Sequence, residues 1–294
     1  MTIDRIVLGS TIGHRFSRLL VYLTLILAAV VYIGPLLVVL LTSVKSLDEV
    51  RAGTLLQLPH AVTFAPWKAA LLSQCIGVSC TGLSHQFVNS FAMVIPAVLL
   101  STPLGAVNGY ALTLWTFKGS DWVYAFLLFG VFMPLQIVLI PLAHVLGLLG
   151  LANTLPGLVL LHVIYGIPFT TLFFRNFFVT VPRDLVSAAR VDGASFWQVF
   201  FRIVLPVAIP SFVVSTIWQF TNIWNDFLLA STFTDGQSAP VTVALYDMVG
   251  AATGVKAYNV DMAAVMLTAL PTLLVYIFAG RYFIRGLMAG SMKG

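Results

Sequence analysis

Long apolar runs separated by short polar segments dominate the pattern of this chain. The runs occupy residues 19–41, 87–112, 122–146, 154–178, 205–230 and 262–283. About 20 apolar residues cross the hydrocarbon core of a bilayer, and a helix satisfies its own backbone hydrogen bonds there. The pattern therefore predicts an all-α integral membrane protein, a six-helix transmembrane bundle within residues 19–285. Gly157, Gly166 and Pro168 interrupt the fourth run and weaken its signal.

Composition supports the membrane class independently of the pattern. Only 9% of the residues are charged and the mean hydropathy is +1.00, whereas soluble domains carry about 25% charged residues. The net charge of +5 does not suggest nucleic acid as a partner, because the sequence has no basic run interleaved with aromatic residues.

The distribution of lysine and arginine predicts the orientation, since cytoplasmic segments carry the excess of these residues. With the N-terminus inside, the eleven inside residues are Arg5, Arg15, Arg18, Lys118, Arg175, Arg183, Arg190, Arg202, Arg281, Arg285 and Lys293. The four outside residues are Lys45, Arg51, Lys68 and Lys256. Segments 1–18 and 286–294 are therefore predicted to be cytoplasmic. The first apolar run is too long for the apolar part of a signal peptide and is predicted to be a retained anchor.

Two predicted outside segments, 45–85 and 232–261, are longer than simple turns. Long ordered loops on one face usually contact a partner, although they could also merely cap the bundle. Cys75 and Cys80 lie in the first of these segments. They either form a disulfide in an oxidising compartment or are two small buried residues.

One predicted inside segment, 181–202, is too charged to lie within the bilayer, where each charge costs roughly 2.5–3.5 kcal/mol. Pro182 suits the first turn of a helix, and Leu185, Ala188 and Ala189 share one face of it. Gly193 then interrupts the pattern. We expect a short helix outside the membrane, a bend and a return to the bilayer. Its small residues favour close approach by another protein over burial in the lipid interface.

This segment carries a resemblance to a known family. Ser187-Ala188-Ala189, Gly193 and the later Ile203-Val204-Leu205-Pro206 resemble the cytoplasmic Glu-Ala-Ala-x-x-x-Gly and Ile-x-Leu-Pro signature of permease subunits in bacterial binding-protein-dependent ABC importers. The closing segment 286–294, Trp-Asn-Asp-Phe at 224–227, Asn-Ser at 89–90 and Gly-Leu-x-Asn-Thr at 150–154 resemble the maltose-permease type of carbohydrate importer. The resemblance covers residues 19–294.

The resemblance implies the fold of type I ABC importers, with a short cytoplasmic coupling helix and a place in the bacterial inner membrane. It implies four kinds of partner: a second permease subunit, two copies of an ATP-binding subunit, a periplasmic sugar-binding protein and the lipid bilayer. The residues expected to dock on the ATPase are Ser187, Ala188, Ala189, Arg190, Asp192, Gly193 and Ala194. Ser187 replaces the glutamate of the family and cannot form an ion pair, so docking would depend on the remaining residues. An inactive permease is the alternative that this replacement leaves open.

No phosphate-binding loop of the Gly-x-x-x-x-Gly-Lys-Ser/Thr kind occurs in the sequence, so this chain is not predicted to be an enzyme or to hold a cofactor. ATP and Mg would bind the partner ATPase. Polar residues within apolar runs either line a pathway or hydrogen-bond between helices. The candidates for a sugar pathway are Gln136, Trp218, Asn222, Trp224, Asn225 and Asp226. His144 and His162 are expected to make structural bonds.

Two other classes of function remain open at this point. An ion-coupled secondary transporter would need buried acidic residues within its spans, and the apolar runs hold none apart from Asp226 near the end of one run. A non-transporting membrane subunit or a membrane enzyme is the second alternative, but no nucleophile with a base partner is evident. A general resemblance to glucose or mannose permeases is the only indication of the sugar.

Overall fold

The computed structural model describes residues 3–54, 56–77, 80–250 and 256–291, with side chains for 17–54, 56–77, 80–250 and 256–280. Most of the predicted N-terminal segment 1–18 and the tail 286–294 therefore lie outside the described side chains. The chain divides into two compact units. One consists of Met1–Ala70 and Ala252–Leu267, and the other of Leu71–Ala251 and Thr268–Gly294.

The first unit contains α1 (Ile3–Ser43), α2 (Leu47–Ala52), most of α3 (Ala65–Leu72) and the start of α14 (Tyr258–Ser291). Ser46 caps α2 by accepting a hydrogen bond from the backbone N–H of Glu49. The side-chain amide of Asn259 donates to the carbonyl of Lys45 at 3.0 Å. The end of α1 and the start of α14 are thus tied together within this unit.

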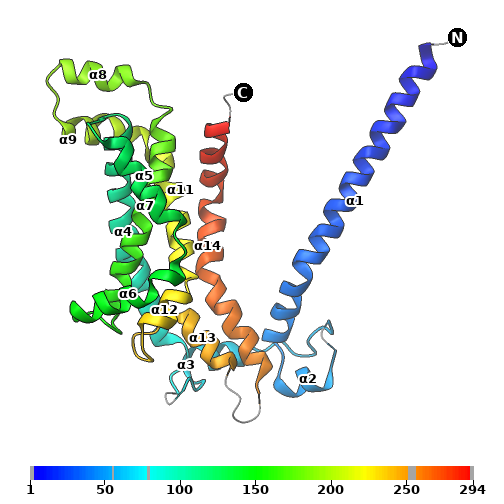
Figure 1. The fold of residues 1–294 in the computed structure, drawn as a ribbon. Helices are drawn as coiled ribbons and strands as arrows, with labels where there is room; N and C mark the ends of the chain where they lie inside the picture. The colour runs from blue at the N-terminus through cyan, green and yellow to red at the C-terminus, as the bar shows by residue number, and fades with distance from the viewer. Residues whose placement is uncertain (1–2, 55, 78–79, 251–255, 292–294) are drawn as a thin grey trace. The chain divides into compact units, whose positions relative to one another are not determined.

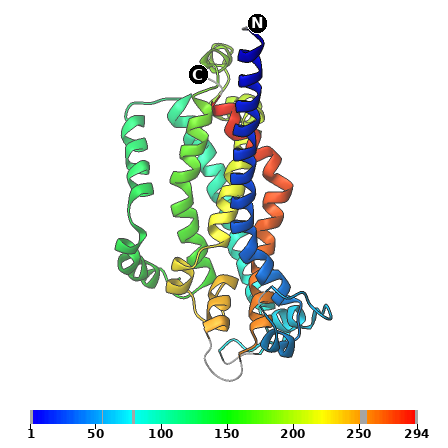
Figure 2. The ribbon, with the colours of Figure 1, turned by 90° about the vertical axis from the view of Figure 1, so that its right-hand side faces the viewer.

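The second unit is a helical bundle, in which α4 (Ser84–Thr113), α5 (Ser120–Phe132), α7 (Leu155–Phe178) and α11 (Ile209–Trp224) run side by side (Figures 1 and 2). The short helices α8 (Arg183–Val191) and α9 (Phe196–Val199) lie at one end of these four. At the other end lie α6 (Leu135–Leu148), α12 (Leu228–Phe233) and α13 (Val241–Gly250). The two ends therefore present different short helices.

The helices α4 and α7 form the closest packed pair in this bundle. A Cβ atom at Gly109 would lie 2.8 Å from the Cβ of Phe174, and one at Gly105 would meet the side chain of Thr170. The hydroxyl of Thr170 donates to the carbonyl of Ser101 on the facing helix at 2.9 Å. Small residues spaced by four let two helix backbones approach closely in a membrane. Gly105 and Gly109 form such a pair.

Four helices within the described residues are long and apolar enough to cross a membrane: Ser17–Ser43, Ser84–Thr113, Leu155–Phe178 and Tyr258–Gly280. Two bent helix pairs pass the same test when each pair is taken together, which raises the number to as many as six. The predicted interruption of the fourth run does not occur, because α7 is one continuous helix from Leu155 to Phe178.

The run predicted as one span at 122–146 is instead two helices, α5 and α6, that meet at 101°. Pro134 lies between them. Proline has no N–H to donate to the carbonyl four residues earlier, and it disfavours helical backbone at the preceding residue. Pro134 therefore weakens the helix locally at the position of the break.

The run predicted at 205–230 is also divided. The segment Phe196–Val207, which includes the π-helix η1 (Phe200–Val204) and the short α10 (Leu205–Val207), meets α11 at 78°. Pro206 and Pro210 have no backbone N–H group, so a continuous helix would lack two of its hydrogen bonds around this bend. A second break at residues 225–227 separates α11 from α12.

Cys75 and Cys80 are joined by a disulfide. This outcome decides between the two alternatives that the sequence left open. The bond closes a short loop directly before α4, in the second unit.

Candidate functional site

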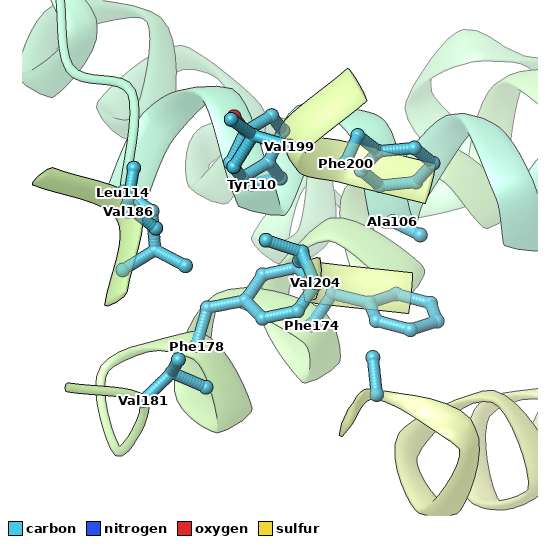
Figure 3. Close-up of a cluster of buried hydrophobic side chains, with 11 residues drawn as sticks. Ala106, Tyr110, Leu114, Phe174, Phe178, Val181, Val186, Val199, Phe200 and Val204 are labelled. Carbon is cyan, nitrogen blue, oxygen red and sulfur yellow. The ribbon is translucent and has the colours of Figure 1, made fainter. Parts of the chain in front are cut away.

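The helix α8 lies at one end of the bundle with most of its surface exposed. Val186 is its only buried residue, at 3% exposure. This side chain joins a cluster of buried apolar residues that includes Tyr110 of α4 and Phe178 of α7 (Figure 3). The cluster also contains Val199 and Phe200, which follow α8 in the chain. One apolar contact therefore connects α8 to the ends of several bundle helices.

The chain leaves α8 through a turn that requires glycine. Gly193 has φ of +81°, a left-handed conformation in which its N–H donates to the carbonyl of Arg190. The N–H of Ala194 donates to the carbonyl of Ala189 at 2.9 Å. This pair of bonds is the Schellman motif, in which residues with a Cβ are strained at the glycine position. The pattern from Ala188 to Ala194, Ala-Ala-x-x-Asp-Gly-Ala, thus ends α8 and sets the direction in which the chain leaves it.

Arg190 fastens the exposed side of α8 to the bundle. Its guanidinium lies 4.5 Å from the centre of the Trp115 ring, at the end of α4. A cation over an aromatic face is stabilised by roughly 0.5–1 kcal/mol at exposed sites. Trp115 in turn packs edge-on against Phe196 at 5.6 Å between ring centres. Arg190 therefore holds α8 against aromatic residues of its own chain.

Replacing Arg190 with glutamine is expected to loosen α8 without unfolding the bundle. Loss of about 1 kcal/mol should raise the amide exchange rates of α8 roughly fivefold where exchange follows local opening. Hydrogen–deuterium exchange of segment 183–192 measures this. Arg183→Gln, at the opposite end of the same helix, should leave those rates unchanged or lower them, because it removes a positive charge from a helix N-terminus. Equal rates in Arg190→Gln and the native chain would contradict the proposed fastening.

The residues predicted to dock on a partner occupy three kinds of position. Ser187, Ala188 and Asp192 are exposed. Ala189 and Ala194 are half-buried and pack against the apolar cluster. Arg190 and Gly193 hold the helix and its exit turn. The open surface of α8 also includes Leu185 at 48% exposure and Val191 at 87%.

A second candidate site is a cavity of about 270 Å³ within the second unit. It lies where α7 passes the break between α5 and α6 and the break between α11 and α12. Trp218, Asn222 and Asp226 line it, as do Gly130 and Leu135 near Pro134. The helix breaks therefore form part of its wall.

The polar residues of the cavity come mainly from two helices. α7 contributes His162 and Tyr165, and α11 contributes Gln219 and Asn222. Phe169 of α7 stacks on Trp218 with ring centres 4.8 Å apart. The cavity thus combines two aromatic rings with several hydrogen-bonding groups.

Asp226 also has a structural role at the end of α11. Its two carboxylate oxygens accept the backbone N–H groups of Leu229 (3.3 Å) and Ala230 (3.0 Å), which caps α12. Its carbonyl accepts a hydrogen bond from the Thr242 hydroxyl of α13 at 2.7 Å. His162 Nε2 lies 3.6 Å from one carboxylate oxygen. Asp226 therefore connects the cavity to the short helices at that end of the bundle.

The other predicted pathway residues lie outside the cavity. Trp224 is fully buried, contacts Phe91 at 5.0 Å between ring centres and donates its indole N–H to the carbonyl of Thr268 at 3.0 Å. Asn225 is exposed in the break after α11, and Gln136 is exposed on the first turn of α6. Of the two roles open to polar residues in apolar runs, Trp224 therefore has the second, which is hydrogen bonding between helices.

The loop between α12 and α13 is fastened to the start of α4. The side-chain amide of Asn89 donates to the carbonyls of Gln237 (2.7 Å) and Ala239 (3.0 Å). Ser90 accepts the backbone N–H of Val241 at 2.9 Å. Within the loop, hydrogen bonds from the backbone and hydroxyl of Ser238 hold the pKa of the Asp235 carboxyl below its usual value. Asn89 and Ser90 thus order this loop through their hydrogen bonds.

Replacing Asn89 with aspartate is expected to release the loop. The carboxylate cannot donate to the two carbonyls, and each buried group left unsatisfied costs about 1–3 kcal/mol. Amides of segment 235–241 should exchange at least about tenfold faster. His85→Ala is the matched control, because His85 contacts the same Gln237 carbonyl at 3.1 Å from an exposed position. If both variants behaved alike, Asn89 would not be the residue that orders the loop.

Several residues of these sites were not predicted from the sequence. Gly105 and Gly109 carry a recognisable spacing of four, but that signal alone does not identify the facing helix. Trp115 lies outside any motif. His162 and Gln219 are polar residues within apolar runs, and in the structure both line the cavity.

Comparison with known proteins agrees with this architecture. Residues 6–286 match the family model described as the binding-protein-dependent transport system inner membrane component. A probable ABC transporter permease protein of Pyrococcus horikoshii is 38% identical over 95% of this chain and 98% of its own length. The diacetylchitobiose uptake system permease protein of Streptomyces coelicolor is 33% identical over 92% of this chain and 87% of its own.

The fold is also found in a solved structure. A chain of a bacterial ABC transporter involved in the import of the acidic polysaccharide alginate superposes with a TM-score of 0.79 at 19% identity, over 92% of this chain and 98% of that one. The predicted all-α membrane fold of the type I importer kind is thereby confirmed. The family consists of membrane transport subunits rather than enzymes. With a family model that covers residues 6–286, this chain belongs to the inner-membrane components of binding-protein-dependent transport systems, the permeases of ABC transporters.

Proposed function

We propose that this chain forms half of the translocation pathway of an ATP-driven sugar importer and couples closure of a separate ATPase to the switch between inward- and outward-facing states. A second permease chain, expected to be a different one, forms the other half. Two copies of an ATP-binding subunit hold ATP and Mg. A periplasmic sugar-binding protein delivers the sugar.

The observation that carries this proposal is the way in which α8 is held. Val186 anchors the helix in the apolar cluster, Arg190 fastens it to Trp115, and the turn at Gly193 returns the chain toward α11. A force applied to the exposed face of α8 would therefore reach α4, α7 and α11 together. An ATPase that closes on ATP can supply such a force.

The orientation is part of the proposal. The segment that contains α8 carries Arg183, Arg190 and Arg202, and cytoplasmic loops are rich in lysine and arginine. We therefore assign the α8 end of the bundle and both termini to the cytoplasm. The opposite end, with α13 and the ordered loop before it, would face the binding protein.

A carbohydrate is the substrate class that the relatives support, because the Streptomyces coelicolor permease belongs to a diacetylchitobiose uptake system. The cavity residues Trp218, Asn222 and Asp226 are proposed to lie on the sugar pathway. Ser187 is exposed and takes no part in the contacts that hold α8 on the bundle, so its replacement of the family glutamate would affect docking on the ATPase and not the fastening of α8. Docking would then use Asp192 and the small exposed surface around Ala188.

The test is reconstitution of this chain with its partner permease and ATPase in proteoliposomes. ATP hydrolysis should rise when sugar-loaded binding protein is added, and sugar uptake should require ATP. Uptake driven by a proton or sodium gradient without ATP would instead support an ion-coupled secondary transporter. Assembly without stimulation or uptake would support a non-transporting subunit.

A further inference from the structure

The cavity between α7 and α11 offers hydrogen-bond acceptors that the chain itself does not use. The amide nitrogen of Asn222 donates to the Trp218 carbonyl at 2.8 Å, and that of Gln219 donates to the Ser101 hydroxyl at 2.9 Å. Within the described residues, the side-chain oxygen of each amide has no hydrogen bond. The carboxylate of Asp226 adds further acceptor capacity, since each oxygen can accept more than one bond. The free groups therefore suit a ligand that donates several hydrogen bonds.

An independent observation indicates a missing polar partner. His162 is 6% exposed, and its Nε2 is buried without a hydrogen bond in the part of the chain that the structure describes. The separation of 3.6 Å from the Asp226 carboxylate is too long for a hydrogen bond. An unsatisfied buried polar atom costs about 1–3 kcal/mol. A hydroxyl group in the cavity would satisfy this nitrogen.

The aromatic side of the cavity suits a ring with an apolar face. Phe169 and Trp218 stack with an interplanar angle of 30°, and Trp218 also contacts Phe173 at 5.8 Å between ring centres. The face of an aromatic ring is negative. It therefore attracts the weakly positive C–H groups on one side of a sugar ring, while the hydroxyl groups at the ring edge reach the acceptors.

The charge of the cavity opposes an anionic ligand. Asp226 is the one acidic residue among those that line it, and no lysine or arginine lines it in the described residues. A carboxylate or phosphate on the ligand would meet a like charge without a compensating cation, which disfavours binding. The volume of about 270 Å³ lies below the roughly 300–1,000 Å³ typical of sites for drug-sized ligands. The cavity therefore accommodates about one ring.

We infer that this cavity binds one neutral sugar ring at a time and rejects rings that carry a carboxylate or a phosphate. This inference rests on the proposed function and adds a substrate class to it. The permease itself would then select against acidic sugars, in addition to any selection by the binding protein. The superposed alginate transporter handles an acidic polysaccharide, so the shared fold would hold cavities of different charge preference.

The test measures sugar binding to the assembled importer in nanodiscs, with the binding protein omitted so that only the permease selects. The probes are tritiated glucose, mannose, galactose and xylose. Unlabelled glucuronate and glucose 6-phosphate serve as acidic competitors. At least one neutral sugar should bind, and both acidic competitors should be at least tenfold weaker than that sugar. Trp218→Ala should weaken its binding at least tenfold, whereas Trp218→Phe should stay within threefold.

Two variants sharpen the result. Asp226→Asn keeps an acceptor but removes the charge, so the disadvantage of glucuronate should shrink. Thr216→Ala is the matched control, because Thr216 lies on α11 in an exposed position outside the cavity. The inference is overturned if no neutral sugar binds, if glucuronate competes as well as glucose, or if Trp218→Ala binds like Thr216→Ala.

A companion measurement separates the two proposals. ATP hydrolysis of the same nanodiscs is recorded with and without sugar-loaded binding protein. Stimulated hydrolysis together with any of the three overturning results rejects the cavity assignment alone. Absence of stimulation in the native complex rejects the proposed importer function.

Discussion

Gly105→Leu is expected to prevent close packing of α4 on α7 and to lower the melting temperature of the purified chain by about 2–12 °C. A Cβ at this position meets Thr170 before any larger side chain is added. Overpacking a tight interface costs about 1–3 kcal/mol and sometimes more, and each kcal/mol moves the melting temperature of a domain of 150–250 residues by about 2–4 °C. The leucine side chain would therefore push α4 away from α7 at their contact.

The control for this variant is Gly147→Leu. Gly147 lies near the end of α6 with nothing within 4 Å of an added Cβ. Both substitutions replace a helical glycine, so both gain similar helix propensity. Thermal unfolding followed by size-exclusion chromatography in detergent compares them. A Gly105→Leu chain that melts with the Gly147→Leu control would mean that α4 and α7 do not approach as closely as described.

Gly193→Val is expected to reduce binding-protein-stimulated ATP hydrolysis at least tenfold in the assembled importer. Left-handed backbone costs an L-residue roughly 1–2 kcal/mol, and a β-branched residue is a clear outlier there. The exit turn of α8 would then open. The helix would lose its bonds from Gly193 and Ala194, and with them its defined direction on the bundle.

Gly193→Asn is the matched control, since asparagine tolerates the left-handed conformation. An added Cβ meets nothing within 4 Å at this position, so steric contact does not distinguish the two variants. Stimulation should be largely retained in Gly193→Asn. Co-purification with the ATPase is measured alongside. Full stimulation in Gly193→Val would mean that α8 does not transmit the force.

The long apolar runs made the main helices predictable. A run such as 154–178 contains enough apolar residues to cross a bilayer, and its helix begins and ends within a residue of the prediction. The short helix at 183–191 and its glycine end were also predictable, because charges exclude the bilayer and Gly193 stops the helix. In both cases the residues of the segment itself were enough to predict the helix.

The breaks were less predictable because proline is tolerated in membrane helices. Pro168 leaves α7 continuous, whereas Pro134 separates α5 from α6. The two residues have the same local effect on hydrogen bonding. What differs is the packing around them, since α7 lies against both α4 and α11, while α5 is largely exposed. Neighbouring helices can compensate for a lost hydrogen bond.

Helical spacing predicts part of the set of residues that line the cavity. Trp218, Asn222 and Asp226 are four residues apart, and such positions share a face of a helix. Trp224 lies six residues after Trp218 and falls on another face. The contributions of His162 and the α5–α6 break come from distant parts of the chain. No spacing rule could have brought them to the same place.

The break at Pro134 has a consequence for the solvent in the bundle. The carbonyl of Gly130 would accept the N–H of residue 134 in a continuous helix, but proline has none. The N–H of Asp226 donates to the carbonyl of Ile223, and so the carbonyl of Asn222 loses its helical donor as well. Gly130 and Asn222 both line the cavity. Lipid cannot satisfy free carbonyls, whereas water can. We therefore expect the cavity to be hydrated when no sugar is present, so that an arriving sugar exchanges hydrogen bonds with ordered water instead of displacing lipid.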